Sequence, residues 1–169
     1  MKLGTMTAVA AMVWMTSAVA QQAGAPATSQ PSPPPAPPFG APVTLDQAIK
    51  AATAAMAKAK DINVPNAVAV VEPSGDLVYF AKMNGAPYSA VQLAQQKAVA
   101  SARYRRPTKV FYDAIEGGHP FYLTFPGVAG APGGVPLIVD GKLIGAIGVS
   151  GGNGDQDMLV SGAGADALK

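Results

Sequence analysis

Apolar side chains recur along this chain in two different periods, and the change of period separates helices from strands. Over residues 45–59 they recur at helical spacing, and Thr44 with Gln47 forms a capping box at the start. A second stripe of small apolar residues over 89–102 predicts another helix, which Pro107 stops. Shorter patterns of the same period predict two further helices, over 108–116 and 155–167.

Four runs rich in β-branched and aliphatic residues predict strands arranged as two hairpins. Asp140-Gly141 joins the second pair, because this dipeptide tolerates the positive φ angles of a two-residue turn. Gly145 and Gly148 interrupt the last strand, which indicates a bulge or the close approach of a helix or ligand. The expected strands are residues 67–71, 77–81, 135–139 and 143–149, with a fifth near 121–125. Together the elements predict an α+β domain with a mostly antiparallel sheet.

Two segments of different composition precede this domain, which we place at 43–169. Residues 1–20 combine a basic start, a short apolar run and small residues at Ala18 and Ala20, a pattern typical of a Sec-type signal peptide cut after Ala20. Residues 21–42 contain half of the 16 prolines and no charge, which predicts a disordered, polyproline-type linker. We therefore expect a periplasmic or extracellular protein with no membrane span after cleavage.

Composition excludes several classes of function. The 12 Lys and Arg against 10 Asp and Glu give a net charge of +2, which argues against a nucleic-acid partner. The absence of Cys excludes disulfides, iron–sulfur clusters and thiol nucleophiles. His119 is the only histidine, so a multi-histidine metal site is excluded as well.

Four groups of residues are candidates for binding, each with a structural alternative. A loop histidine is either a surface residue or a metal or acid–base group, and the aromatic residues after it form either a pocket wall or core. The arginines that close the second helix form either a solvated helix end or a clamp for carboxylates and propionates. Glycine-rich turns either connect elements tightly or hold an anion. The candidates are His119 (also as metal ligand), Arg105, Arg106, Phe121, Tyr122, Gly133, Gly134, Gly151 and Gly152. No spacing of residues identifies a catalytic group.

Six segments, taken in order, resemble the GlcG/HbpS family. They are 67–71 with Pro73-Ser74-Gly75, Met83-Asn84-Gly85-Ala86, Lys97-Ala98, Arg105-Arg106-Pro107-Thr108, residues 132–136, and residues 144–152 with Asp155-Gln156-Asp157. The resemblance covers nearly the whole domain. It implies a profilin-like fold, with a five-stranded antiparallel sheet and helices on both faces, and assembly as a homo-oligomer, often an octamer.

The resemblance implies two alternative functions. HbpS-like members bind haem and are linked to its degradation and to extracellular redox sensing, which implies an exported haem- or tetrapyrrole-binding protein with Arg105 or Arg106 at a propionate. Iron would then be held by His119, a Tyr, a Thr hydroxyl or a Met thioether. Related domains also occur in PduO-type cobalamin proteins.

The second alternative follows from the GlcG-like members, which accompany glycolate-utilisation genes. They imply an accessory protein or enzyme that acts on a small organic acid. In that case the loop 132–136 and the Gly151-Gly152 turn would form the pocket, because backbone N–H groups in such turns hold carboxylates. A scaffold without a ligand is the third possibility.

Overall fold

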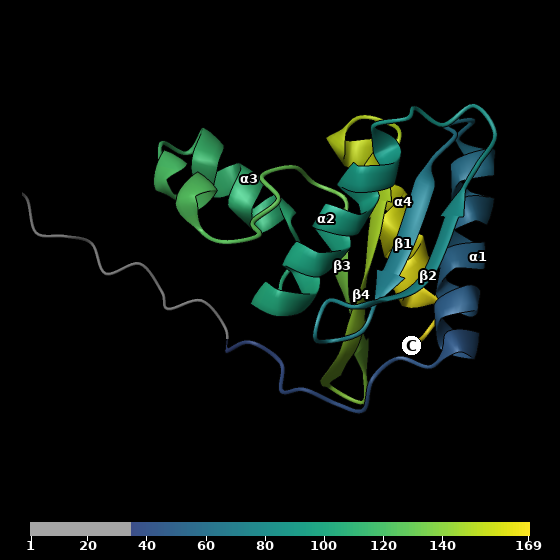
Figure 1. The fold of residues 1–169 in the computed structure, drawn as a ribbon, viewed down its shortest axis with the longest axis horizontal. Coiled ribbons are helices and arrows are strands. Elements are labelled where there is room, and N and C mark those ends of the chain that lie inside the picture. Colours follow the sequence, from purple (N-terminus) through teal and green to yellow (C-terminus); the bar gives the residue numbers. More distant parts are fainter. Residues whose placement is uncertain (1–34) are drawn as a thin grey trace, which may run out of the picture. The chain divides into compact units, whose positions relative to one another are not determined.

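The structure, a computed structural model, describes residues 35–169, so the expected signal peptide and most of the expected linker lie outside the described residues. The described residues form an α+β domain (Figure 1). Its elements are α1 (Leu45–Asp61), β1 (Ala67–Val71), β2 (Leu77–Lys82), α2 (Ala90–Tyr104), α3 (Lys109–Glu116), the 3-10 helix η1 (Pro120–Thr124), β3 (Gly134–Val139), β4 (Lys142–Ser150) and α4 (Gly154–Asp166). Both predicted hairpins and all four predicted helices are present.

The four strands form one antiparallel sheet in the order β2-β1-β4-β3. The two hairpins meet at its centre, where β1 pairs with β4 and Val70 lies opposite Ile147. Every residue of β1 is buried, because helices cover both faces of the sheet. No helix within residues 35–169 is long and apolar enough to cross a membrane.

Helices α1 and α4 pack on one face of the sheet and α2 on the other (Figure 1). The alanines of α2 let this helix lie directly against the strands, with Ala94 and Ala98 in contact with the core around Ala146. A Cβ at Gly148 would overlap the backbone of Ala94 and Ala98. The expected close approach of a helix at Gly148 is therefore confirmed.

The strand expected near residues 121–125 is wrong, because Pro120–Thr124 forms the 3-10 helix η1 instead. Pro120 opens this helix, and the Thr124 hydroxyl donates a hydrogen bond to the Phe121 carbonyl at 2.7 Å. The aromatic rings that suggested a strand stack on one another, with 4.5 Å between the centroids of Phe121 and Tyr122. The sheet of the described residues consequently has four strands rather than five.

Residues 35–42, the described end of the proline-rich segment, run in an extended conformation beside the start of β4, and we call them the N-terminal strap. Leu143 N–H donates to the Pro38 carbonyl, and Gly40 N–H donates to the Leu143 carbonyl, both at 2.8 Å. Strand β1 ends at Val71, opposite Ala146, so the strap occupies the side of β4 that β1 leaves open. This part of the segment is therefore attached to the folded domain.

Candidate functional site

The structure places the predicted binding residues in three different surroundings. The four glycines surround a buried ion pair at one end of the sheet. Arg105 and Arg106 follow the last turn of α2. His119, Phe121 and Tyr122 belong to the segment of α3 and η1, which lies to one side of the sheet in Figure 1.

The buried ion pair joins α2 to α4. Lys97 Nζ lies 2.7 Å from Asp157 Oδ2, and the two side chains are only 4% and 3% exposed. Lys97 also donates to the Val149 carbonyl at 3.1 Å. The other oxygen of Asp157 accepts from Gly152 N–H at 2.9 Å and from Asn66 Nδ2 at 3.1 Å. Both charges are thus compensated by partners on fixed elements, as a buried pair requires.

The glycines make this packing possible rather than lining a cavity. A Cβ on Gly133 would lie 2.9 Å from the Asp157 Cβ and 3.0 Å from Lys97 Nζ, and one on Gly151 would lie 2.8 Å from the Asn66 Cα. Both positions also have positive φ angles, which favour glycine.

Three of the four glycine N–H groups already have acceptors. Gly134 donates to the buried Thr108 hydroxyl at 2.9 Å, Gly152 donates to Asp157, and Gly133 donates to Met158 Sδ at 3.1 Å. These hydrogen bonds leave fewer N–H groups for the carboxylate expected at the loop 132–136 and the Gly151-Gly152 turn, and that expectation stays a prediction.

Sequence reasoning missed Lys97, Asp157 and Asn66 as a connected polar group, and it missed the buried Thr108 beside Gly134. One signal was visible, because Lys97 stands within the alanine-rich stripe of α2, where a charged residue needs a partner. The pairing itself spans 60 residues of sequence. No local pattern connects groups at that separation.

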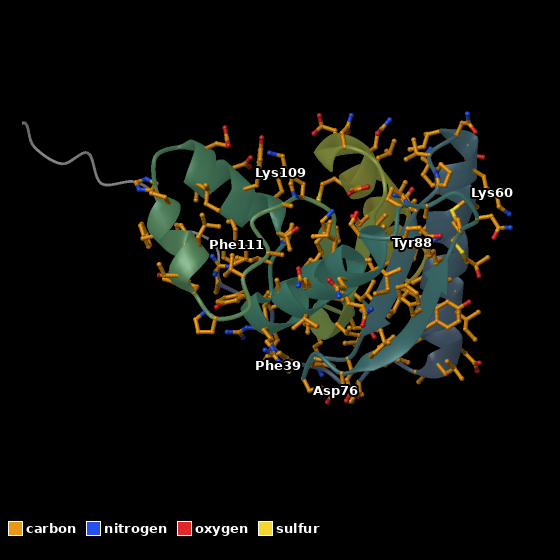
Figure 2. All side chains as sticks on the ribbon, turned by 45° about the horizontal axis from the view of Figure 1, so that its top comes forward. Phe39, Lys60, Asp76, Tyr88, Lys109 and Phe111 are labelled. Carbon is orange, nitrogen blue, oxygen red and sulfur yellow. The ribbon has the colours of Figure 1, made fainter. Side chains whose placement is uncertain are left out.

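Five aromatic residues form a cluster that joins α3 and η1 to the end of α2, and we call them the aromatic cluster. Phe111, labelled in Figure 2, is buried and makes an edge contact with Tyr104 at 5.1 Å between centroids. Tyr122 lies 5.9 Å from Phe111 and 5.2 Å from Phe125. Tyr104 also donates its hydroxyl to the Pro126 carbonyl at 2.9 Å. The cluster consists of Tyr104, Phe111, Phe121, Tyr122 and Phe125.

Part of this segment presents apolar side chains to solvent. Phe121 is 52% exposed, Leu123 is 62% exposed, and Phe125 is exposed as well. The exposed His119 ring meets Phe121 edge-on at 6.0 Å between centroids. No hydrogen bond or ion pair joins the His119 side chain to another described residue. We call His119, Phe121, Leu123 and Phe125 the aromatic surface.

The two predicted arginines contact the chain's own backbone. Arg105 Nη1 donates to the Pro37 carbonyl of the strap at 3.3 Å, and its guanidinium lies 5.1 Å from the Phe39 ring centroid. Arg106 Nε donates to the Tyr104 carbonyl at 3.2 Å. Neither arginine forms an ion pair with a carboxylate of the described residues.

The side chains of residues 35–169 include no group of three or more His, Asp or Glu placed to hold a metal ion.

The protein is thus an α+β domain whose sheet is covered by helices on both faces and which carries a histidine on an exposed aromatic surface. Residues 43–166 match the model of the family described as haem degrading protein HbpS-like, and the chain belongs to this family. It is 35% identical over 110 residues to protein GlcG of Escherichia coli strain K12, covering 64% of this chain and 82% of that protein.

Two solved structures share the fold. The crystal structure of HbpS has a TM-score of 0.72 and 30% identity, over 77% of this chain and 92% of that one. The crystal structure of PduOC in complex with haem has a TM-score of 0.69 and 26% identity, over 76% of this chain and 96% of that one. The GlcG/HbpS resemblance of the sequence is thus confirmed.

Proposed function

We propose that this protein binds haem or a related tetrapyrrole at the aromatic surface, with His119 as the protein ligand of the iron. The observation that carries the proposal is the exposed His119 ring beside exposed apolar side chains, Phe121 above all. Membership of the HbpS-like family and similarity to PduOC, which was solved with haem, support the same ligand.

The chemistry of these residues fits the group. Exposed apolar patches on a protein mark binding surfaces, and flat aromatic rings match the faces of a planar macrocycle. A neutral imidazole is a common axial ligand of haem iron, and the His119 side chain is not engaged by another described residue. The iron would supply redox or ligand-binding chemistry when bound, while the protein supplies the imidazole and the apolar contact.

Arg106, which contacts Tyr104 of the aromatic cluster, is our candidate for binding a propionate. Its guanidinium uses one N–H for the carbonyl of Tyr104, a member of the aromatic cluster, and has further donors. Tyr122 is half-buried in the same cluster and stacks on the ring of Phe121.

The proposal includes export of the protein from the cytoplasm. The pattern of residues 1–20 supports a signal peptide cut after Ala20, so the mature protein would begin at Gln21 in the periplasm or outside the cell. Mass spectrometry of the protein recovered from the producing cells tests this. An N-terminus at Gln21 is expected, and a protein that retains Met1 in the exported fraction would contradict it.

The proposal includes two further expectations from the family resemblance. The protein assembles as a homo-oligomer, up to an octamer, and its fold is of the profilin-like type. The oligomer is checked by light scattering coupled to size-exclusion chromatography. A single species at the monomer mass of 17.0 kDa or below would contradict it.

A haemin titration followed by visible absorbance tests the binding site. We expect a saturable shift of the Soret band that His119→Ala abolishes. Tyr88→Ala is the matched control, because Tyr88 is also an exposed aromatic residue, 92% accessible, but lies on the loop between β2 and α2. Equal Soret shifts in the wild type and His119→Ala would overturn the assignment of the ligand.

The GlcG-like alternative, an accessory protein or enzyme for a small organic acid, has support from the 35% identity to GlcG. The glycine turns do not favour it, because the N–H groups of Gly133, Gly134 and Gly152 already have acceptors. A small acid would need a different cavity.

A further inference from the structure

A cavity of about 330 Å³ lies along the open edge of β3. Its walls are apolar, formed by Pro136 and Ile138 of β3, by Ala165 of α4, and by Pro107 after α2. The volume is within the range of cavities that hold small organic ligands, and such sites combine apolar walls with a few polar groups.

The polar groups at the rim are mainly cationic. Arg105 and Lys169 line the cavity together with Asp166. Lys169 and Asp166 neutralise each other, with 2.6 Å between Nζ and Oδ1. The guanidinium of Arg105 forms no ion pair with a carboxylate of the described residues, so its charge is available to an anionic ligand.

Arg105 is also held in place more firmly than a surface arginine. Its φ of 53° places it in the left-handed region at the end of α2, a position that glycine usually takes. Its side chain lies over the Phe39 ring and donates one hydrogen bond to the Pro37 carbonyl. These two contacts orient the guanidinium before any ligand arrives, and its remaining donors form no other hydrogen bond within the described residues.

The edge of β3 is unsuited to a further strand. The N–H and C=O groups of Gly134 are both hydrogen-bonded to Thr108. Gly134 therefore has no backbone group left to pair with a further strand at the start of this edge. Pro136, two residues on, has no N–H. An extended peptide would find almost no ladder partners there, which favours a small molecule as the occupant.

We propose that this cavity binds a small carboxylic acid with an apolar body. The carboxylate accepts hydrogen bonds from the Arg105 guanidinium, and the apolar body packs against Pro136, Ile138 and Ala165. This site shares no residue with the aromatic surface, so the proposal does not depend on haem binding.

Phenylacetate serves as the probe and phenylacetamide as its uncharged counterpart, with binding to the full protein measured by isothermal titration calorimetry. We expect saturable binding of phenylacetate that is at least about tenfold tighter than that of the amide, because charge-assisted hydrogen bonds are the stronger ones. Arg105→Gln should weaken phenylacetate binding by at least about tenfold. Ala165→Leu should weaken it by filling the cavity while leaving the charge in place.

Two control variants separate this site from others. Arg103→Gln removes an exposed arginine of the same helix that does not line the cavity, and His119→Ala removes the proposed haem ligand; both should bind phenylacetate as the wild type does. Equal affinity for the acid and the amide would overturn the proposal. So would unchanged binding in both Arg105→Gln and Ala165→Leu, or the absence of saturable binding by the wild type.

Discussion

Lys97 Nζ and Asp157 Oδ2 lie 2.7 Å apart in the interior, and this contact ties the helix on one face of the sheet to a helix on the other. Removing two charges from water costs several kcal/mol per ion, so such a pair persists only when its geometry and remaining hydrogen bonds are satisfied. Val149, Gly152 and Asn66 provide those bonds. The network consequently fixes the end of the sheet where β1 begins and β4 ends.

Lys97→Met should destabilise the protein by about 3–5 kcal/mol, because it leaves the Asp157 carboxylate buried without its cation. Urea denaturation followed by far-UV circular dichroism measures the loss. A change of less than about 1 kcal/mol would show that Asp157 is accommodated in another way.

Lys109→Met is the matched control for that experiment. Lys109 Nζ and Asp113 Oδ1 lie at a similar distance, 2.6 Å, but both side chains are about half exposed, so we expect almost no change in stability at neutral pH. The hydrogen bond that Lys109 donates to Asp113 raises the pKa of Lys109 above its ordinary value of 10.5. The small stabilisation is therefore present at neutral pH and is lost as the pH rises through that raised pKa.

The fold was largely predictable because its signals are local. The capping box at Thr44, the Asp140-Gly141 turn and the alanine stripes each specify an element within a few residues of sequence. The strand expected at 121–125 failed because Pro120 and stacking between neighbouring rings outweighed the β-propensity of the aromatic residues.

Replacing Gly164 and Gly162 of α4 by alanine should change the stability of the protein in opposite directions. A Cβ on Gly164 would lie 2.8 Å from the Ala51 carbonyl oxygen, so Gly164→Ala must push α4 from α1 and should cost about 1–3 kcal/mol. A Cβ on Gly162 meets nothing within 4 Å. Gly162→Ala should therefore stabilise the helix by about 0.5–1 kcal/mol.

Thermal denaturation of the two glycine variants checks this pair of predictions. A lower melting temperature for Gly164→Ala and a higher one for Gly162→Ala are expected. Destabilisation by Gly162→Ala would indicate that this face of α4 is covered in the folded protein, for instance by a second copy of the chain.

Thr108→Val should cost about 1–3 kcal/mol, since it leaves the buried N–H of Gly134 without its acceptor while nearly preserving the side-chain volume. Thr124→Val is the control, because the hydroxyl of Thr124 makes an exposed hydrogen bond to the Phe121 carbonyl. Chemical denaturation of the two variants should show a clear loss only for Thr108→Val. Equal losses of stability would mean that the buried hydrogen bond to Gly134 contributes no more than the exposed one of Thr124.

The candidate sites were less predictable than the fold because each depends on contacts between distant residues. Gly133 and Gly151 were recognised as parts of turns, but Gly133 packs against Lys97 and Gly151 packs against Asn66, both distant in the sequence. Arg105 was recognised as a cation, yet its position at the rim of a cavity depends on the strap and on α4. Sequence patterns identified the residue types and left their partners undetermined.

Phe111 and Phe121 lie in the same aromatic cluster, but their substitution by alanine should affect different properties. Phe111→Ala should lower stability, and Phe121→Ala should weaken haem binding. Phe111 is 2% exposed, so Phe111→Ala should cost about 3–5 kcal/mol of stability. Phe121 is exposed, so Phe121→Ala should leave the unfolding midpoint almost unchanged but weaken haemin binding by removing apolar contact beside His119. Urea titrations and haemin titrations of both variants provide the two readouts. If Phe121→Ala bound haemin as tightly as the wild type, the aromatic surface would not be the site, even if the protein bound haem elsewhere.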